Sequence, residues 1–218
     1  MKTFYDDKYA DKFEKYYQLL IEWNNKFNLT AITERDEVMV KHFADSLSGE
    51  RFIPNGAKVL DIGAGAGFPS LPIKIVRNDI NLTMLDSVNK KVGFLNEVVS
   101  ALNLENARAL HSRVEDFSQK ECFDIVLSRA VASLNTLCEY ALPFVKVGGI
   151  FIAYKSEKTD EEVALAKNAI AILGGEIERI TTEEVDEGMV RKLVIIKKVK
   201  PSPSKYPRGK NLPRVKPL

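Results

Sequence analysis

The segment from Val59 to Pro69 limits what this chain can fold into more than any other part of the sequence. An apolar run leads into Asp61, three glycines follow at positions 63, 65 and 67, and Pro69 suits the first turn of a helix. Glycine has no Cβ, so the backbone can turn sharply there and let a ligand approach closely. The pattern therefore predicts a nucleoside-cofactor site at the end of the first strand of an α/β sheet.

The spacing of the glycines distinguishes two classes of nucleoside cofactor. The dinucleotide fingerprint is G-x-G-x-x-G/A, and its last small residue lets a helix pack on a strand. Counted from Gly63, that last position is Phe68, which is too large. The pattern here is acidic-x-G-x-G-x-G, the form used by S-adenosylmethionine-dependent methyltransferases. Asp61, Gly63 and Gly65 are therefore candidate cofactor-binding residues, and a nicotinamide dehydrogenase is disfavoured.

A second acid supports this interpretation. The run Leu82–Asp86 predicts a strand that ends in a carboxylate, about 20 residues after the glycine loop, where an acid suits ribose hydroxyls. An ordinary glycine-rich turn with surface acids does not account for both features in the right strand order. We expect Asp86 to accept hydrogen bonds from the two hydroxyls of a ribose.

Apolar periodicity after residue 50 predicts strands that alternate with helices. Helices are expected over 69–77, 89–102, 133–144 and 157–173, and strands over 58–62, 82–86, 108–111, 123–128, 150–155, 178–182 and 191–198. Such alternation implies right-handed crossovers and a mainly parallel sheet. The last two strands are joined too tightly for a crossover, so one is antiparallel. The predicted fold class is α/β: a Rossmann-like class I methyltransferase with seven strands, mainly parallel, and one reversed edge strand.

The chain divides into three parts. The first, 1–50, is predicted to be a helical extension, with an aromatic stripe on one helix and Thr33 as the candidate N-cap of the next, which runs to Leu47. The second, 51–200, is the S-adenosylmethionine-binding core. The third, 201–218, is a basic C-terminal segment, and the Pro/Ser-rich stretch 200–204 is predicted to be a linker into it.

Charge is concentrated at the C-terminal end. The net charge is +2, yet ten Lys and Arg residues and no acid lie between residues 188 and 218, which leaves the rest of the chain acidic. A basic end on an acidic body predicts a polyanionic partner, with a solvated, disordered tail as the alternative. Tyr206 and the spaced prolines favour an ordered nucleic-acid contact. The candidate RNA-binding residues there are Lys205, Arg208 and Lys210.

Composition bounds the remaining possibilities. The chain has 218 residues, 45% of them hydrophobic, which is enough for one sizeable core, and no apolar run reaches the roughly 20 residues of a membrane span. The charged N-terminus does not suit a secretory signal. Cys122 and Cys138 form no C-x-x-C pair and no metal-ligand cluster, so we expect buried free thiols, no metal and a reducing, cytoplasmic location.

Ligands on open α/β sheets bind at the carboxyl ends of the strands, so the residues after each strand are candidates for the site. The segment 112–116 follows the third strand, where an acid or a backbone N–H can bind the edge of adenine. Arg129 follows the fourth strand and would reach the junction of cofactor and substrate, although a structural ion pair is the alternative. Lys155 follows the fifth. His42 either positions RNA or is structural, and Asn28 and Asp45 are candidate organisers of the N-terminal helices.

Several segments together resemble the RsmG/GidB family over nearly the whole chain. They are 28–30 (NLT), 42–47 (HFADSL), 59–72, 85–87 (LDS), 90–91 (KK), 94–95 (FL), 113–115 (RVE), 128–130 (SRA) and 205–208 (KYPR). This family consists of bacterial methyltransferases that modify guanine N7 of 16S ribosomal RNA. The resemblance implies cofactor contacts at Gly63, Phe68, Val114, Glu115 and Arg129. Two departures are Ser70 and Ser156, at positions where the family commonly has glycine.

The expected chemistry agrees with what the sequence lacks. Guanine N7 has an in-plane lone pair and no proton to remove, so an enzyme mainly supplies proximity and alignment. No Asn/Asp-Pro-Pro-Tyr/Phe motif for exocyclic amines and no Pro-Cys nucleophile for pyrimidine C5 is present. A 2′-hydroxyl target would use an activated lysine with acids; Lys155 fits this role, but Ser128 and Arg129 stand where an acid is needed.

We therefore expect a monomeric enzyme that methylates guanine N7 at a single site in 16S ribosomal RNA of the 30S subunit. Arg129 is its candidate catalytic residue, and Lys155 is a further candidate RNA contact. The alternatives are another RNA site, a small-molecule or protein methyltransferase, and a non-catalytic RNA-binding assembly protein.

Overall fold

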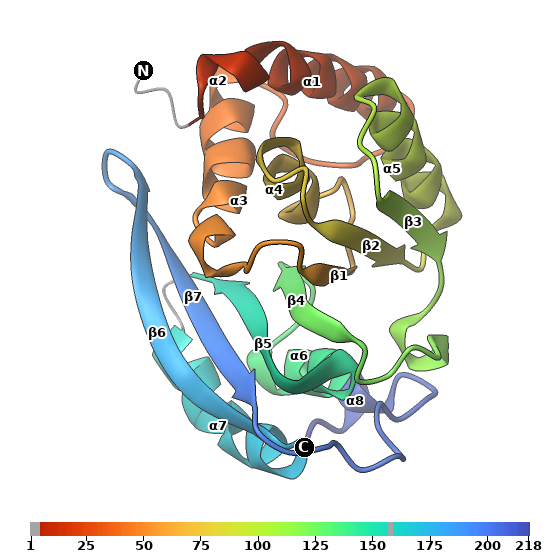
Figure 1. Ribbon diagram of the computed structural model, residues 1–218, viewed down its shortest axis with the longest axis vertical. Coiled ribbons are helices and arrows are strands. Elements are labelled where there is room, and N and C mark those ends of the chain that lie inside the picture. The colour runs from red at the N-terminus through yellow and green to blue at the C-terminus, as the bar shows by residue number, and fades with distance from the viewer. Residues whose placement is uncertain (1–4, 157–158) are drawn as a thin grey trace.

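A twisted sheet of seven strands forms the middle of the molecule (Figure 1). The computed structural model describes residues 5–156 and 159–218. The strands lie in the order β3-β2-β1-β4-β5-β7-β6. Their bounds are β1 (Lys58–Ile62), β2 (Asn81–Asp86), β3 (Ala107–His111), β4 (Phe123–Arg129), β5 (Val145–Lys155), β6 (Gly175–Asp186) and β7 (Met189–Lys198). The predicted α/β class and all seven predicted strands are confirmed, and the arrangement is that of a Rossmann-like class I methyltransferase.

One strand runs against the others, but it does not lie where the sequence analysis placed it. β1 to β5 pair in parallel, whereas β7 pairs antiparallel with both β5 and β6. The reversed strand is therefore internal, and the edge strand β6 runs with the rest. The helix before β6 carries the chain past the open side of β5, and the tight turn at Glu187–Gly188 then folds β7 back into the gap.

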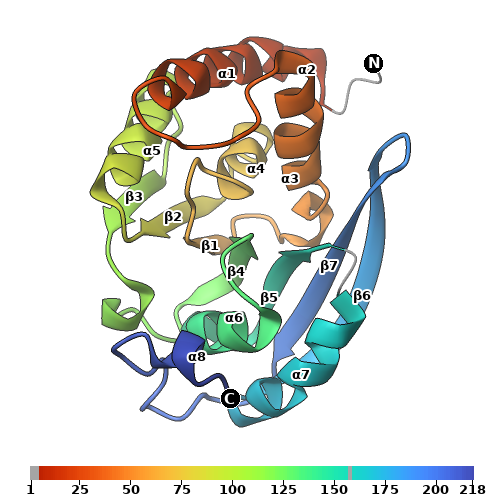
Figure 2. The same cartoon turned by 180° about the vertical axis from the view of Figure 1, so that it is seen from behind.

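Helices cover both faces of the sheet (Figures 1 and 2). One face carries α1 (Ala10–Asn24), α2 (Arg35–Val38), α3 (Asp45–Leu47), α4 (Ser70–Val76) and α5 (Asn89–Ala101), and the other carries α6 (Leu134–Ala141), α7 (Thr159–Ile172) and α8 (Leu212–Val215). Short 3-10 turns span Asp7–Tyr9, Glu50–Phe52, Val114–Asp116 and Leu142–Phe144. Two hydrophobic clusters, one on each face, form the core.

The N-terminal helices belong to the same core as the sheet. The rings of Phe13, Tyr16 and Phe43 are fully buried beside Phe94 of α5. The Tyr16 hydroxyl donates a hydrogen bond to the carbonyl oxygen of Ala66, at 2.5 Å. The predicted aromatic stripe is thus core, and it fixes α1 directly on the glycine loop.

The second helical segment differs from the expectation at its start and in its middle. Its N-cap is Glu34 rather than Thr33, because the Glu34 carboxylate accepts hydrogen bonds from the backbone N–H groups of Asp36 and Glu37. Between α2 and α3, residues Met39–Ala44 form a π-helical turn, and the Asp45 N–H reaches back to the carbonyl of Val40. Wide turns of this kind frequently mark functional sites.

The C-terminal segment, residues 201–218, packs on the face covered by α6 and α7. The predicted linker is held in place: the Ser202 hydroxyl donates to the Leu173 carbonyl, and the Ser202 N–H donates to Glu121. The buried Lys198 ammonium donates to the Leu142 carbonyl and to the Ser202 hydroxyl. The predicted linker is therefore bound to the fold by specific hydrogen bonds.

The two cysteines also differ from one another. Cys138 is buried as expected, but Cys122 is exposed, because it lies in the turn before β4 rather than in the strand itself. In the part of the chain that the structure describes, no helix has the length and apolar character needed to cross a membrane.

Candidate functional site

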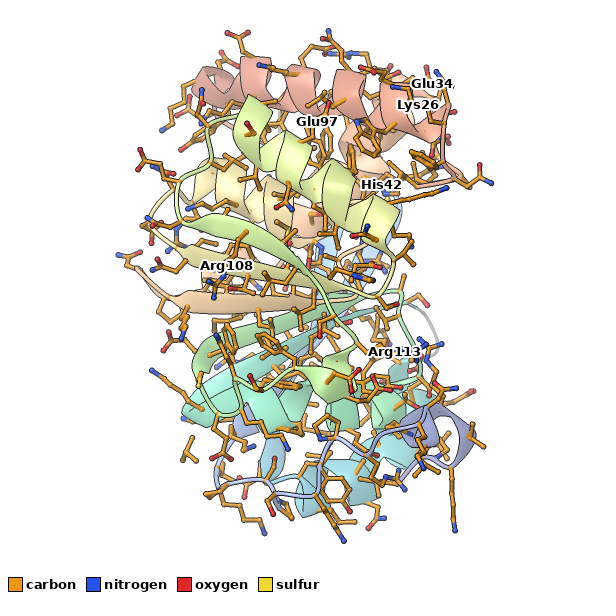
Figure 3. The ribbon with its side chains drawn as sticks, turned by 90° about the vertical axis from the view of Figure 1, so that its right-hand side faces the viewer. Lys26, Glu34, His42, Glu97, Arg108 and Arg113 are labelled. Carbon is orange, nitrogen blue, oxygen red and sulfur yellow. The ribbon has the colours of Figure 1, made fainter. Side chains whose placement is uncertain are left out.

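Two cavities lie side by side at the carboxyl edge of the sheet. Arg108 at the start of β3 and Arg113 just after its end mark opposite edges, and His42 lies on the side of Arg113 (Figure 3). The first cavity has a volume of about 670 Å³ and the second about 710 Å³. Ala130 and Val131, which follow β4, line both cavities. A group bound in one cavity is therefore adjacent to a group bound in the other.

The glycine loop is shaped by the strand beside it and by Val131. The N–H groups of Gly63 and Ala64 both donate to the Leu85 carbonyl, which turns the chain sharply at the end of β1. Gly63 has φ of +70°, and a Cβ there would lie 2.6 Å from a methyl carbon of Val131. Gly65 has φ of +60°, but a Cβ there would meet only the Gly63 oxygen, at 3.8 Å. A side chain at Gly65 would thus meet little of the protein, although Gly65 itself lines neither of the two cavities.

Asp86 is fixed by the loop and faces the first cavity. One of its carboxylate oxygens accepts the Gly65 N–H at 2.9 Å, and the other accepts the Val88 N–H at 2.8 Å. Each oxygen of a carboxylate accepts more than one hydrogen bond, so both retain capacity for ligand hydroxyls. Asp86, the residue predicted to bind the ribose, can therefore accept hydrogen bonds from two neighbouring hydroxyl groups.

Asp61 lies beneath the loop rather than in the wall of the cavity. It is fully buried, and Ser70 of α4 donates a hydroxyl hydrogen bond to its Oδ2 at 2.5 Å. Its Oδ1 has no hydrogen-bond partner among the described residues. Burial raises the pKa of this carboxyl from 3.8 to about 7. Ser70, one of the departures from the family pattern, thus supplies the hydroxyl partner that this acid needs.

Four of the predicted cofactor residues meet in the first cavity. Gly63 and Asp86 line it together with Val114 and Glu115, which form the 3-10 turn after β3. Tyr140 of α6 and two residues of the C-terminal segment, Asn211 and Arg214, also line this cavity. None of the three was predicted from the sequence. The basic charge, Tyr206 and the spaced prolines of this segment all indicated RNA rather than the cofactor.

The second cavity is organised around a buried carboxylate. Asp45 is fully buried and pairs with Arg129 through Oδ2 and with Arg191 through Oδ1, both at 2.5 Å. The structural ion pair considered for Arg129 is therefore present. Arg191 was not a predicted site residue, although β7 is antiparallel and its first residues must lie at the edge where the other strands end. That topology is the signal that could have identified it.

His42 is held as a neutral imidazole. Its Nδ1 lies 3.3 Å from Nη2 of Arg129, and its Nε2 lies 2.7 Å from Oγ1 of Thr30. Because a guanidinium can only donate, Nδ1 accepts and Nε2 carries the proton, which it donates to Thr30. Burial, assisted by the charge of Arg129, lowers the pKa of His42 to about 4.

Phe68 connects the glycine loop to this histidine. It is buried and stacks on the His42 ring, with centroids 4.5 Å apart, and the Arg129 guanidinium lies 4.9 Å from the centre of its ring. The predicted cofactor contacts Phe68 and Arg129 thus lie together but line no part of the first cavity, and Arg129 lines the second.

Two predicted RNA contacts have internal partners instead. The buried Lys155 ammonium donates to the Ala132 carbonyl at 2.8 Å and to Glu162 at 2.6 Å. Arg208 pairs with the buried Glu139 through two contacts, of 2.8 and 2.6 Å. Both cations are therefore paired with carboxylates of the fold. Lys155 also lines the second cavity, and the contact of both residues with RNA stays a prediction. Lys205 and Lys210 are exposed.

Comparisons with known proteins agree with this geometry. A family model described as GidB, rRNA small subunit methyltransferase G, matches residues 9–191. Two curated relatives carry the name ribosomal RNA small subunit methyltransferase G. The protein from Desulforamulus reducens is 54% identical, covering 94% of this chain and 89% of the relative, and that from Lachnoclostridium phytofermentans is 50% identical, covering 95% and 89%.

Solved structures show the same fold at low sequence identity. M. jannaschii TYW2 in complex with AdoMet has a TM-score of 0.61 and 13% identity, covering 78% of this chain and 80% of that one. A SAM-dependent methyltransferase from Aquifex aeolicus has a TM-score of 0.56 and 18% identity, covering 76% and 94%. The fold, the site at the carboxyl edge and the family match over most of the length lead to one conclusion: this chain belongs to the GidB family of rRNA small subunit methyltransferases G.

Proposed function

We propose that this chain uses S-adenosylmethionine to methylate N7 of one guanine in the 16S ribosomal RNA of the small subunit. Membership of the GidB family supports methylation of small-subunit ribosomal RNA as the activity. The position of the methyl group and the roles of individual residues are our inference from the two cavities.

The first cavity fits an adenosine-bearing cofactor. Asp86 lines it and retains acceptors for two ribose hydroxyls, and the Gly65 N–H holds one of the carboxylate oxygens in place. Val114 and Glu115 line the part of the cavity that follows β3, where the edge of adenine would bind. When bound, S-adenosylmethionine supplies a methyl group activated by its sulfonium centre.

The second cavity is suited to the target base. Arg129 lies there with its guanidinium against the ring of Phe68. An arginine donates up to five N–H groups, and among the described residues Asp45, Lys41 and His42 do not use all of those on Arg129. We infer that Arg129 donates to guanine O6, because a nucleophilic N7 must keep its lone pair free.

The ionisable groups of the second cavity favour a reaction that needs no general base. The imidazole acceptor of His42 is occupied by Arg129, and the Asp45 carboxylate is paired with two arginines. The Lys155 ammonium donates to Glu162, so it acts as a donor rather than as the base that a 2′-hydroxyl target would require. Methylation at N7 requires only that the base be held in line with the methyl group.

The observation that carries the proposal is the junction between the cavities. Ala130 and Val131 line both, and Arg129 precedes them directly. A base that enters the second cavity must be single-stranded or unstacked, as is usual for enzymes that modify a nucleobase.

Methyl transfer to purified 30S subunits and to free 16S RNA, both from a strain that lacks this enzyme, tests the proposal. We expect radiolabel from S-adenosylmethionine to enter one guanosine, identified as N7-methylguanosine by mass spectrometry of nuclease digests. Arg129→Gln should lose most of this transfer. A label at a 2′-oxygen or an exocyclic amine would contradict the proposed position. Absence of any transfer, together with no binding of S-adenosylhomocysteine, would favour a non-catalytic assembly protein.

A further inference from the structure

The C-terminal segment forms part of the wall of the first cavity. Its last helix, α8, follows Asn211, and both Asn211 and Arg214 line that cavity. Figure 2 shows α8 lying against α6. The basic charge of this segment predicted a contact with RNA, and its position at the first cavity indicates a second role.

The segment is attached to the fold by several side chains. Arg208 forms its two contacts with the buried Glu139 of α6 and also donates to the Lys216 carbonyl at 2.8 Å. The Thr136 hydroxyl of α6 donates to the carbonyl of Pro213, which is buried, at 3.0 Å. Because these contacts flank Asn211 in the chain, they hold this part of the cavity wall in a defined position.

The order of the strands tells which end of the cofactor lies near Arg214. The proposed function puts the ribose at Asp86, after β2, and the adenine at Glu115, after β3, and both residues line the first cavity. In the order β3-β2-β1-β4, the amino-acid end of the cofactor would then extend towards β1 and β4. Nη2 of Arg214 donates to the carbonyl of Val131, which follows β4, at 3.2 Å. Arg214 is thus at the methionine end.

That end of the cofactor carries a carboxylate. A carboxylate that leaves water needs a cation or N–H donors, and the guanidinium fork matches it with two parallel hydrogen bonds. Two further cations, Lys91 and Arg113, line the cavity, but they follow β2 and β3 and so lie at the nucleoside end. The exposed guanidinium of Arg214 is therefore placed to bind this group.

We infer that Arg214 binds the carboxylate of the methionine moiety, which makes the C-terminal segment part of the cofactor site. The inference rests on the proposed function, since it takes S-adenosylmethionine as the ligand. It predicts that binding of the amino-acid portion, and not of the nucleoside, depends on the last ten residues.

Calorimetry with two ligands tests this directly. S-adenosylhomocysteine carries the carboxylate, whereas 5′-methylthioadenosine has the same nucleoside thioether without the amino-acid portion. We expect Arg214→Gln to raise the Kd of S-adenosylhomocysteine about 10- to 100-fold, as for loss of a charge-assisted hydrogen bond, and to change that of 5′-methylthioadenosine by less than about twofold. Arg214→Lys should recover part of the loss.

Lys216→Gln is the matched control, because it removes an exposed cation from the same segment, two residues away, and should change neither affinity. Thermal unfolding without ligand should be the same for Arg214→Gln and the parent, since Arg214 is exposed. Equal weakening of both ligands, or of neither, would overturn the inference while leaving the proposed function standing. If the parent protein binds neither ligand, the cofactor assignment fails and the inference fails with it.

Discussion

Asp45 is the residue on which the second cavity depends most. It is fully buried, and it neutralises two arginines that come from different strands. Removal of one partner from a buried pair leaves a desolvated charge and typically costs about 3–5 kcal/mol. The ion pair between Asp45 and Arg129 keeps the Arg129 guanidinium next to the His42 ring, where the positive charge favours the neutral imidazole. Asp45, Arg129 and His42 thus hold one another in position, and Arg129 favours the neutral form of His42.

The charge of Arg129 should be measurable through His42. Arg129→Gln removes a nearby positive charge, so the pKa of His42 should rise from about 4. It should stay below 6.5, because burial is the larger cause of the shift and remains. NMR titration of the imidazole resonances checks this, and the exposed His111 is the internal control. No change at His42 would contradict the arrangement described here.

Asp61 should make stability depend on pH in an unusual direction. Its carboxyl has a pKa of about 7 in the folded protein, raised by burial from 3.8. Between these values the folded state binds more protons than the unfolded state, so its contribution to the free energy of unfolding falls as pH rises. Asp61→Asn removes this dependence.

The comparison of the two proteins isolates that effect. Relative to Asp61→Asn, the parent should lose up to about 4 kcal/mol between pH 4 and pH 7, measured by urea unfolding. His42 acts in the opposite direction, because its pKa is lowered and its contribution is lost as pH falls below 6.5 towards 4. That contribution is common to both proteins and cancels. Parallel curves for the two proteins would show that Asp61 is not protonated near neutral pH.

At the scale of elements, the glycine loop and the π-helical turn meet at Phe68. The loop follows β1 and brings Phe68 under the His42 ring, which the π-helical turn presents from the opposite side. Tyr16 of α1 holds the loop from above through the Ala66 carbonyl. The helical extension therefore supports the cofactor site as well as covering the sheet.

Alanine substitutions at Gly65 and at a control glycine should distinguish an effect on ligand binding from an effect of backbone strain. Gly65→Ala places a Cβ in the open space of the loop and forces alanine to a φ of +60°. Gly56→Ala is the matched control, because Gly56 has φ of +68°, nothing within 4 Å of its Cβ, and lies in the turn before β1. Both variants should lose about 1–2 kcal/mol of stability.

Only Gly65→Ala should weaken binding of S-adenosylhomocysteine, by about tenfold or more in calorimetry, because the Gly65 N–H is bonded to Asp86, the proposed ribose acceptor, and strain at Gly65 displaces that carboxylate. Equal affinities in the two variants would place the ligand away from the loop.

At the scale of the whole molecule, basic residues are concentrated at the C-terminal end of the sequence, but in the folded protein several of them lie beside acids from other parts of the chain. The ten cations after residue 188 include Arg191, Lys198 and Arg208, which neutralise or contact groups of the fold. The exposed cations of the segment, such as Lys205 and Lys210, remain available to a polyanion. Figure 1 shows that the C-terminal segment lies at the opposite end of the molecule from α1 and α2.

The salt dependence of RNA binding should report these exposed lysines. Each phosphate contact contributes about 0.7–0.9 to the slope of log K against log salt, so Lys205→Ala with Lys210→Ala should make the slope shallower by about 1.5. Filter binding of 16S RNA at salt concentrations from about 50 to about 200 mM measures this slope. Arg208→Ala should instead lower stability by about 3–5 kcal/mol, because it leaves Glu139 buried without its partner. An unchanged slope in the double variant would place the RNA elsewhere.

The sheet and the glycine loop could both be predicted from the sequence alone. The turn after β1 needs glycine at positive φ, and Asp86 ends the neighbouring strand, so both features follow from local backbone geometry and the period of apolar residues. The sequence also indicated that one strand is reversed, from the short connection between the last two strands. The position of that strand was decided by which gap in the sheet remained open.

Only the tertiary structure decided which charges work together. Arg191 lies 146 residues from Asp45, and Arg208 lies 69 residues from Glu139, yet each forms an ion pair in the folded protein. A basic residue has the same local pattern whether its partner is a buried carboxylate, a phosphate or a cofactor. Lys155, Arg208 and Arg214 could therefore be recognised as cations from the sequence, but their partners depend on long-range packing that brings distant carboxylates and cavities beside them.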